Sequence, residues 1–409
     1  MTDSQGSINL LWAHRIIDGL FQLGVRHFYI SPGSRSTPLV VALADHPLAQ
    51  HVVHFDERGT AFCALGCAKA QNKASAIIVT SGTAVGNLLP AIMEASNSRV
   101  PLIFLTADRP KELLDCGDNQ TCDHIKLFSS YVRWQIDLPT PSASISEKYL
   151  LSSLSQAVYK AQENNPGPVH INCPFPKPLV PLQTPVSFQN LQLFPYEPTQ
   201  TLSQIDSLQK WAAAFQKAKK GVIIVGSCPT GQKAEPIFDL AQKLKWPVLA
   251  DPLSHARALG KTKGLIRYYD AILKTSSRGI EPDLIFDPKE GSSLKASKLD
   301  FEPDLILHLG DRLTSKALAQ WLQKLNISDY FQVSNHPNRQ DPNYLVTSRL
   351  CVDPSLFCEM ISPLLEDKND SSWMGSWEEA SQKAYENLNI RGEGRSFRKT
   401  GKDQRKDAM

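Results

Sequence analysis

Four short apolar segments, each ending in a polar turn and followed by a helix-forming stretch, dominate the first 180 residues. They span residues 27–30, 51–55, 75–80 and 101–106. Strands that are apolar along their whole length and alternate with helices are typical of a parallel sheet covered on both faces. The pattern predicts an α/β fold with a doubly wound parallel sheet, in which ligands bind beyond the carboxyl ends of the strands.

The same alternation begins again in the second half of the chain. A helical stretch over 206–219 precedes further apolar segments at 221–227, 246–251, 305–311 and 330–334. Seven prolines lie between Pro174 and Pro198, which indicates an extended linker. We therefore predict two doubly wound domains, at 1–180 and 205–365, joined by a Pro-rich linker at 181–204.

Composition narrows the class of protein. Hydrophobic residues make up 42% of the 409 residues and charged residues 21%, which is typical of a globular chain. No apolar run reaches the roughly 18–20 residues of a membrane helix, and the eight cysteines form no CxxC pair. The net charge of +3 comes from the basic segment 391–409, and the charge of the remaining chain gives no indication of a nucleic-acid surface. We expect a cytoplasmic protein that binds neither membrane nor nucleic acid.

Three polar clusters follow the first three apolar segments. Asp56-Glu57-Arg58 fits either a functional carboxylate or a helix N-terminal acid stabilised by the helix dipole. The segment 31–38, SPGSRSTP, fits either an anion site built from amides and Arg35 or a capping turn with a solvated arginine. The run Thr80–Thr83 lacks the GxGxxG and P-loop patterns, so it supports neither a dinucleotide nor a nucleoside triphosphate.

These clusters are more informative together, with the other motifs of the chain, than each is alone. SPGSRSTPL, HFDERG, VTSGTAVGNLLPA, LTADRP and CGDNQ occur in this order, and the second half adds WPVLADPLS, LGDRLTSKALAQWL and NHPNRQDP. Over residues 8–365 the chain closely resembles the 2-succinyl-5-enolpyruvyl-6-hydroxy-3-cyclohexene-1-carboxylate synthases. These are thiamine-diphosphate enzymes of menaquinone and phylloquinone biosynthesis. The resemblance implies that 1–180 is a pyrimidine-binding domain and 205–365 the central domain.

The resemblance also implies a reaction, which is decarboxylation of 2-oxoglutarate and 1,4-addition of the succinyl carbanion to isochorismate. It places Glu57 against the aminopyrimidine ring of thiamine diphosphate as the catalytic proton-exchanging group, and assigns cofactor contacts to Ser81, Gly82 and Thr83. Substrate contacts carry over by motif to Ser34, Arg35, Arg109, Gln120 and Lys316. Many members have an arginine after that lysine, where this chain has Ala317.

The C-terminal part departs from the resemblance. These enzymes hold Mg²⁺ or Mn²⁺ on a third domain through a Gly-Asp-x motif and a later Asn. Gly117-Asp118-Asn119 and Gly310-Asp311 lack that context, so we expect no metal ligands in this chain. The third domain would begin near residue 366. We expect 366–409 to be a truncated stump of it, ending in a basic, disordered tail.

The resemblance implies a homodimer or homotetramer, or a separate chain that carries the third domain. Two other interpretations stay open. One is a non-catalytic remnant or binding module that retains the fold. The other is a different thiamine-diphosphate carboligase or decarboxylase, although a small neutral donor would not need the arginines of SPGSR and TADRP.

Overall fold

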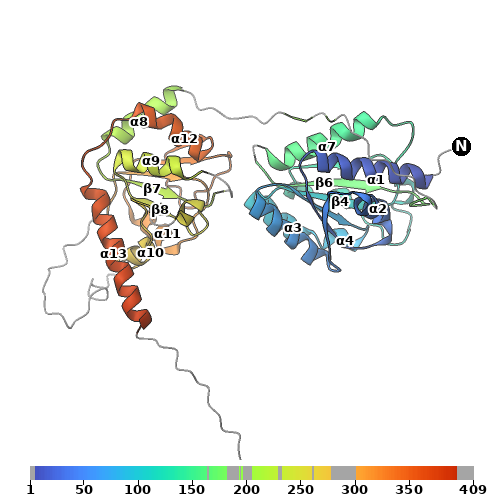
Figure 1. Cartoon of the computed structure of the whole chain (residues 1–409), viewed down its shortest axis with the longest axis horizontal. Coiled ribbons are helices and arrows are strands. Elements are labelled where there is room, and N and C mark those ends of the chain that lie inside the picture. Colours follow the sequence, from blue (N-terminus) through green and yellow to red (C-terminus); the bar gives the residue numbers. More distant parts are fainter. Residues whose placement is uncertain are drawn as a thin grey trace, which may run out of the picture. The chain divides into compact units, whose positions relative to one another are not determined.

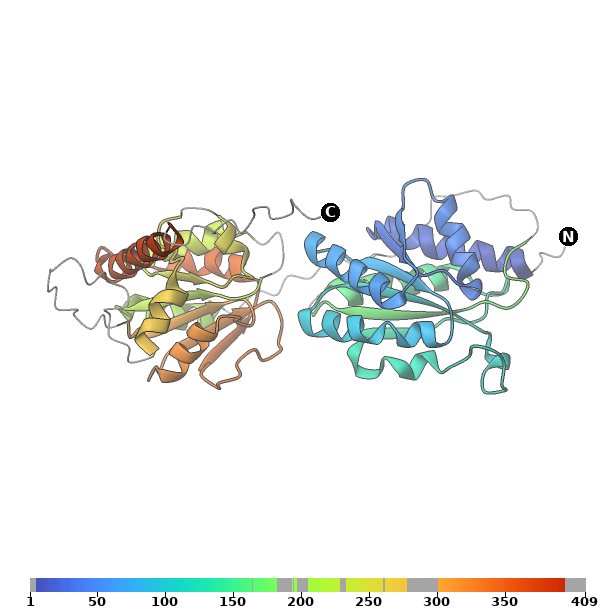
Figure 2. The same cartoon turned by 90° about the horizontal axis from the view of Figure 1, so that it is seen from below.

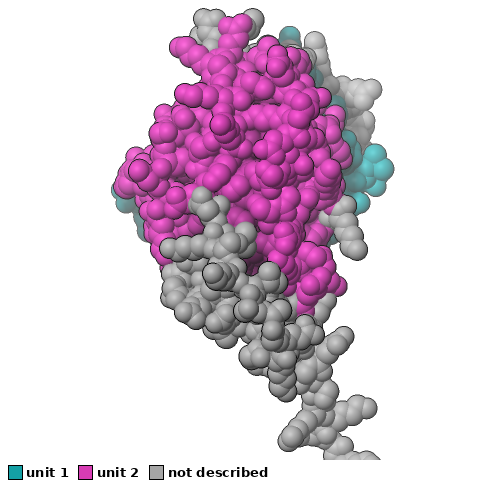
Figure 3. Space-filling view, turned by 90° about the vertical axis from the view of Figure 1, so that its left-hand side faces the viewer, with its two compact units in different colours: residues 1–200, 229–231 teal, residues 201–228, 232–409 magenta. Residues whose placement is uncertain are grey.

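A computed structural model shows the chain as two compact units. It describes residues 5–163, 165–181, 193, 195–196, 205–228, 233–259, 262–277 and 301–393. Unit 1 comprises residues 1–200 and 229–231, and unit 2 comprises 201–228 and 232–409. Figures 1 and 2 show the elements of each unit, and Figure 3 gives the two units different colours. Most of the predicted linker 181–204, and the tail beyond residue 393, lie outside the described residues.

Unit 1 is built on a parallel sheet in the order β2-β1-β3-β4-β6-β5. Its strands are β1 (His27–Ile30), β2 (Gln50–Val53), β3 (Ser75–Val79), β4 (Leu102–Asp108), β5 (Trp134–Asp137) and β6 (Pro168–Pro174). Strands β3, β4 and β6 are buried along their whole length, whereas β2 at the edge is exposed. The parallel sheet predicted from the apolar segments is confirmed.

Helices cover both faces of this sheet, as the ribbons of unit 1 show (Figure 1). One core contains α1 (Gln5–Gln22), α2 (Thr37–Asp45) and α7 (Glu147–Gln162). The other contains α3 (Glu57–Gln71), α4 (Thr83–Gly86), α5 (Leu89–Ser98) and the buried ring of Phe128. Successive strand residues alternate between the cores: Phe28 lies in the first and Tyr29 in the second. This two-sided burial explains the uninterrupted apolar strands.

Unit 2 repeats this architecture with the sheet order β11-β10-β9-β7-β8, again parallel. The strands are β7 (Gly221–Val225), β8 (Val248–Ala250), β9 (Leu305–Leu309), β10 (Tyr330–Ser334) and β11 (Ser348–Cys351). One face packs against α8 (Ile205–Lys217), α9 (Glu235–Leu244) and α12 (Pro354–Ile361). The other packs against α10 (Tyr269–Ser277), α11 (Lys316–Lys324) and α13 (Ser372–Glu393).

Helix α13 differs from the expectation for the segment after residue 365. Trp377 is fully buried in the core of unit 2, and the indole N–H of Trp373 donates to the carbonyl of Gly221 at 2.9 Å. An apolar side chain of this size buried between β-strands and neighbouring helices contributes on the order of 2–3 kcal/mol to folding. The described part of the segment therefore packs as an integral element of unit 2.

Candidate active site

The polar segments predicted from the sequence meet at one edge of the unit 1 sheet. Because β2, β1, β3 and β4 are neighbours and parallel, their carboxyl ends lie side by side. Glu57 follows β2, Arg35 follows β1, Ser81 follows β3 and Arg109 follows β4. The site residues of unit 1 that the sequence indicated are thus gathered at the edge where ligands bind in such sheets.

Glu57 lies in the first turn of α3, directly after the helix N-cap residue. The neighbouring Asp56 caps the helix, since its side chain accepts from the amides of Arg58 at 2.8 Å and Gly59 at 3.1 Å. The side-chain hydrogen bond from Arg58 lowers the pKa of Asp56 to about 2. Glu57 is half-buried and takes one hydrogen bond, from the Asn87 amide at 3.1 Å. Because Asp56 serves as the cap, the Glu57 carboxylate is available to a ligand.

The turn Ser81–Thr83 has a backbone that only glycine adopts easily. Gly82 has a φ of 81°, and a Cβ there would lie 2.7 Å from the Cγ of Gln120. The Gln120 amide donates to the carbonyl of Ser81 at 2.8 Å, and the Arg109 guanidinium donates to the Ser81 hydroxyl. The segment after β4 therefore closes over the turn after β3 and fixes its conformation.

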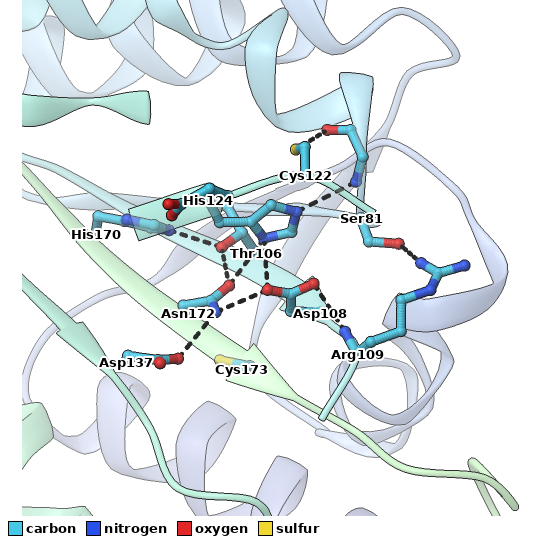
Figure 4. A network of polar contacts seen from close by, with 12 residues as sticks. Ser81, Thr106, Asp108, Arg109, Cys122, His124, Asp137, His170, Asn172 and Cys173 are labelled. Carbon is cyan, nitrogen blue, oxygen red and sulfur yellow. Dashed lines mark hydrogen bonds and ion pairs between the residues drawn. The ribbon is translucent and has the colours of Figure 1, made fainter. Parts of the chain in front are cut away.

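A buried polar network lies beneath this turn (Figure 4). The amide of Gly82 donates to Nε2 of His124 at 3.2 Å, so the imidazole proton lies on Nδ1, which donates to the Asn172 Oδ1 at 2.9 Å. The Asn172 Nδ2 donates to Asp108 and to Asp137, both at 3.0 Å. The amide of Asn172 is thereby oriented by all four contacts, which also include the Thr106 hydroxyl at 2.9 Å. The network connects the centre of the sheet with the Gly82 turn.

The network also includes a second imidazole, that of His170 on β6. His170 contacts the Thr106 hydroxyl through Nε2 at 2.7 Å and lies edge-on to the Phe128 ring. Burial lowers the pKa of His170 to about 3, with a smaller contribution from His124. The ring is therefore neutral at ordinary pH. His124, Asn172 and His170 were not predicted as site residues; the signal for the last two is polar residues within the apolar strand PVHINCP.

Two arginines place guanidinium groups at this edge of the sheet. Both side chains are largely buried, with relative accessibilities of 7% for the Arg35 residue and 8% for Arg109. Arg35 donates through Nη1 to the carbonyl of Phe175 at 2.8 Å. Arg109 donates through Nε to Asp118 at 2.9 Å and through Nη1 to the Gln120 carbonyl at 2.9 Å. Burial lowers the pKa of Arg35, and the charge of Arg109 adds to this effect.

Each guanidinium keeps donors that no described residue uses. Among the residues that the structure describes, Arg35 Nε and Nη2 and Arg109 Nη2 have no hydrogen-bond acceptor. These donor atoms are not among the buried polar atoms without a partner, so solvent or a ligand reaches them, and guanidinium groups match carboxylates in geometry. The arrangement can therefore bind an anion, in particular a carboxylate.

The remaining predicted substrate residues differ in position. Ser34 is exposed in the 3₁₀ turn Ser34–Ser36 after β1, and thus lies at the same edge. Lys316 is exposed at the start of α11 in unit 2, so it belongs to a separate body from the others. The adjacent Ala317 is buried in the unit 2 core. Position 317 therefore faces the interior of this unit, which explains why a small apolar residue fits there.

The two Gly-Asp sequences have carboxylates that are engaged elsewhere. Asp118 pairs with Arg109, and Asp311 pairs with the buried imidazole of His336. Within the described ranges, no group of three His, Cys, Asp or Glu side chains is placed to hold a metal ion. No described helix is long and apolar enough to cross a membrane.

Comparison with known proteins agrees with this architecture. Residues 12–127 match the family described as thiamine pyrophosphate enzyme, N-terminal TPP binding domain, and residues 293–397 match the middle domain of thiamine pyrophosphate enzymes. The structure is similar to that of benzoylformate decarboxylase from Polynucleobacter necessarius, with a TM-score of 0.61 and 16% identity. That likeness covers 88% of this chain and 62% of the other, and concerns the fold. The two units are therefore the first and middle domains of a thiamine pyrophosphate enzyme.

Curated sequences define the family more narrowly. The synthase of Rubrobacter xylanophilus named 2-succinyl-5-enolpyruvyl-6-hydroxy-3-cyclohexene-1-carboxylate synthase is 34% identical over 396 residues, covering 95% of this chain. The enzyme of the same name from Shewanella halifaxensis is 39% identical over 352 residues, covering 84% of this chain and 57% of its own. Protein PHYLLO of Arabidopsis thaliana is 36% identical over 361 residues, which are 85% of this chain and 20% of that protein.

The chain belongs to the family of 2-succinyl-5-enolpyruvyl-6-hydroxy-3-cyclohexene-1-carboxylate synthases, as its sequence motifs predicted. It spans 65%, 62% and 64% of the length of three of these relatives, which is just under two thirds. The middle-domain match extends to residue 397 and so includes α13.

Proposed function

We propose that this chain supplies the pyrimidine-binding and central domains of a synthase that joins 2-oxoglutarate to isochorismate. In the proposed reaction 2-oxoglutarate loses CO₂, and its succinyl unit adds to isochorismate to give 2-succinyl-5-enolpyruvyl-6-hydroxy-3-cyclohexene-1-carboxylate. The proposed enzyme is a transferase of menaquinone or phylloquinone biosynthesis. Family membership supports the general pathway. The specific substrates rest on the chemistry of the sheet edge.

The observation that carries the proposal is the pair of buried arginines with unused N–H donors. Arg35 and Arg109 each place a guanidinium at the same edge, close enough that the charge of Arg109 contributes to lowering the pKa of Arg35. Both proposed substrates carry two carboxylates, and arginine binds a carboxylate through two parallel hydrogen bonds without losing its charge. A donor without a second carboxylate would leave the unused N–H donors of one arginine without an acceptor from the ligand.

Thiamine diphosphate is the proposed cofactor, and the described residues suit its aminopyrimidine end. When bound, thiamine diphosphate supplies an electron sink for decarboxylation. Glu57 would exchange a proton with a ring nitrogen, a task that its carboxylate can take because Asp56 serves as the helix cap. The Ser81–Thr83 turn, fixed by Gln120 and His124, would form the adjoining wall.

Mg²⁺ or Mn²⁺ is proposed to accompany the diphosphate, because charge neutralisation of a diphosphate commonly requires such an ion. We assign it no ligand among the described residues, since the two Gly-Asp carboxylates pair with Arg109 and His336. Its ligands would come from another segment or from a separate chain that carries the diphosphate-binding domain.

We further propose that the protein acts in the cytoplasm as a homodimer or homotetramer. Apolar side chains on β2 and the turn to α3 support an assembly, because large exposed apolar patches mark interaction surfaces. Val53 is 59% exposed and Phe55 is 86% exposed, and Phe62 on α3 adds to this surface. We call this set the β2–α3 surface, and sedimentation at micromolar concentration would measure the assembly.

Selectivity for the 2-oxo acid tests the proposed function. The chain would be co-expressed with the C-terminal third of the Rubrobacter relative, and CO₂ release would be measured with 2-oxoglutarate and with pyruvate. We expect a preference for 2-oxoglutarate of roughly 100-fold or more in kcat/KM, since a site built for a carboxylate rejects a substrate that lacks it. Arg109→Gln should remove most of this preference. Equal or better use of pyruvate would contradict the proposed substrate.

A further inference from the structure

Arg109 already holds a carboxylate from its own chain. Its Nε donates to the Asp118 Oδ2 at 2.9 Å, at the side of the guanidinium where Nε and Nη2 present two parallel donors. Its Nη1 is used by the Gln120 carbonyl and the Ser81 hydroxyl. A ligand carboxylate that binds Arg109 through two hydrogen bonds therefore needs Nε, the donor that Asp118 occupies.

Asp118 can leave this position at low cost. Its side chain is 35% exposed, against 8% for the side chain of Arg109. It lies in the segment between β4 and α6 (His124–Leu127), where Cys116, Gly117, Asn119 and Gln120 are also exposed. A carboxylate that is one-third accessible regains water when its partner is taken, whereas the buried guanidinium needs a replacement.

The local charge balance gives Asp118 a second effect. The electrostatic neighbours of Arg35 are Arg109, Asp118 and Asp108. Two guanidinium and two carboxylate groups make this set neutral overall while Asp118 is ionised. The hydrogen bond from Arg109 lowers the pKa of Asp118, which keeps it ionised at neutral pH. An incoming anion therefore meets a site whose positive charge is already compensated by Asp118 and Asp108.

We propose that Asp118 is an internal competitor for the substrate carboxylate, so that only a ligand that gains a further contact, such as a dicarboxylate, binds tightly. This inference rests on the proposed function, because it concerns the same arginines. A ligand with one carboxylate exchanges one Arg109 contact for another and gains little. A dicarboxylate displaces Asp118 and also reaches the unused donors of Arg35, so it gains a second charged contact.

Binding of succinate, an unreactive dicarboxylate, and of acetate provides the test. Calorimetry at pH 7 and low salt would compare the chain with Asp118→Asn and Asp115→Asn. Asparagine at 118 keeps an acceptor for Arg109 but removes the competing charge. Asp115 is exposed in the same segment, and its φ of 55° suits asparagine, so the control removes an equal charge away from Arg109.

We expect Asp118→Asn to tighten acetate binding about fivefold and succinate binding by at least as large a factor, because the same competitor is removed for both ligands and succinate carries the larger charge. Asp115→Asn should change neither by more than about twofold. The Arg109 Nε–H resonance in an arginine-labelled sample should shift on succinate binding in the parent chain. In the ligand-free Asp118→Asn variant, the chemical shift of this resonance should already lie closer to that of a solvent-exposed arginine.

Two results would overturn the inference and are distinguishable. Succinate that binds the parent and both variants equally would show that Asp118 does not compete, and would leave the anion site intact. Failure of succinate to bind any of the three proteins would overturn the inference together with the anion site of the proposed function.

Discussion

The imidazole of His124 accepts a hydrogen bond from the amide of Gly82 at 3.2 Å, and this contact joins the buried network of unit 1 to the proposed site. On its other side the ring donates from Nδ1 to Asn172. Asn172 lies on β6, two strands away from β3 in the sheet, and through His124 it helps to set the backbone of the Ser81–Thr83 turn. We regard His124 as a positioning residue.

Two substitutions at His124 separate its two contacts. In His124→Gln an oxygen can reach the Nε2 position and accept from Gly82, whereas His124→Asn can replace only Nδ1. We expect His124→Asn to raise amide exchange of the 80–86 segment at least tenfold, because the turn loses its acceptor, and His124→Gln to restore most of the protection. Equal exchange in the two variants would remove the positioning role.

Asn172→Asp would place a third carboxylate beside Asp108 and Asp137, each of which now receives a hydrogen bond from the amide at 3.0 Å. Loss of both donors and the like charges should cost on the order of 3 kcal/mol in the unfolding free energy of unit 1 at pH 7.

The cost of Asn172→Asp should depend on pH in a defined direction. Burial and the neighbouring carboxylates would raise the folded pKa of the new carboxyl above its unfolded value, so its protonated form suits the folded state. The deficit relative to the parent should therefore be smallest near pH 4 and should grow as the pH rises. The deficit in unfolding free energy can be measured by urea unfolding, followed by hydrogen exchange of unit 1 peptides. A deficit that shrinks towards pH 7 would contradict the proposed role of Asn172 in the buried network.

The buried neutral His170 predicts a pH dependence for the parent chain. Its folded pKa of about 3 lies below the unfolded value of 6.5, so between these values the unfolded state binds more protons and stability falls as the pH falls. From pH 7.5 to pH 5.5 this one group should remove about 1.4 kcal/mol from the unfolding free energy of unit 1.

His170→Gln is the matched variant, since glutamine can keep the contact with Thr106 without titrating. The difference between the parent and variant curves isolates His170 from other buried imidazoles such as His14, whose pKa is also lowered by burial. Parallel curves from pH 7.5 to pH 5.5 would show that His170 does not have this role.

Glu57→Gln tests the proposed proton exchange with the cofactor. Glutamine preserves the shape and can keep a contact with Asn87, but it cannot exchange a proton with a ring nitrogen. In the chain completed with a relative's C-terminal third, turnover should fall at least about 100-fold with the melting temperature unchanged. Asp56→Asn is the contrasting variant: it weakens the α3 cap and should affect stability more than turnover.

The sequence predicted those parts of the fold that depend on local patterns. Uninterrupted apolar runs such as 75–80 become β3 because burial on both faces removes any alternation, and polar turns mark the carboxyl edge. Strands β5 and β6 did not follow from the same pattern. Trp134–Asp137 is a half-buried edge strand, and β6 carries His170 and Asn172 as part of the network.

The candidate site was likewise predictable only where a local sequence pattern determines the position of a residue. Arg35, Glu57 and Arg109 follow apolar strands directly, so their placement at one edge follows from the topology. The contacts of His124 and Asp118 depend on the path of the 109–124 segment, which no local pattern encodes. Trp377 was assigned outside the central domain for a similar reason, since its partners lie far away in sequence.

Product formation tests the account most directly. The chain, completed with the C-terminal third of a relative, would be incubated with 2-oxoglutarate, isochorismate, thiamine diphosphate and Mg²⁺, and the products would be followed by mass spectrometry. We predict 2-succinyl-5-enolpyruvyl-6-hydroxy-3-cyclohexene-1-carboxylate and CO₂ in equal amounts, reduced at least 100-fold in both Arg109→Gln and Glu57→Gln. CO₂ release without this adduct, or an adduct formed equally well by both variants, would contradict the account.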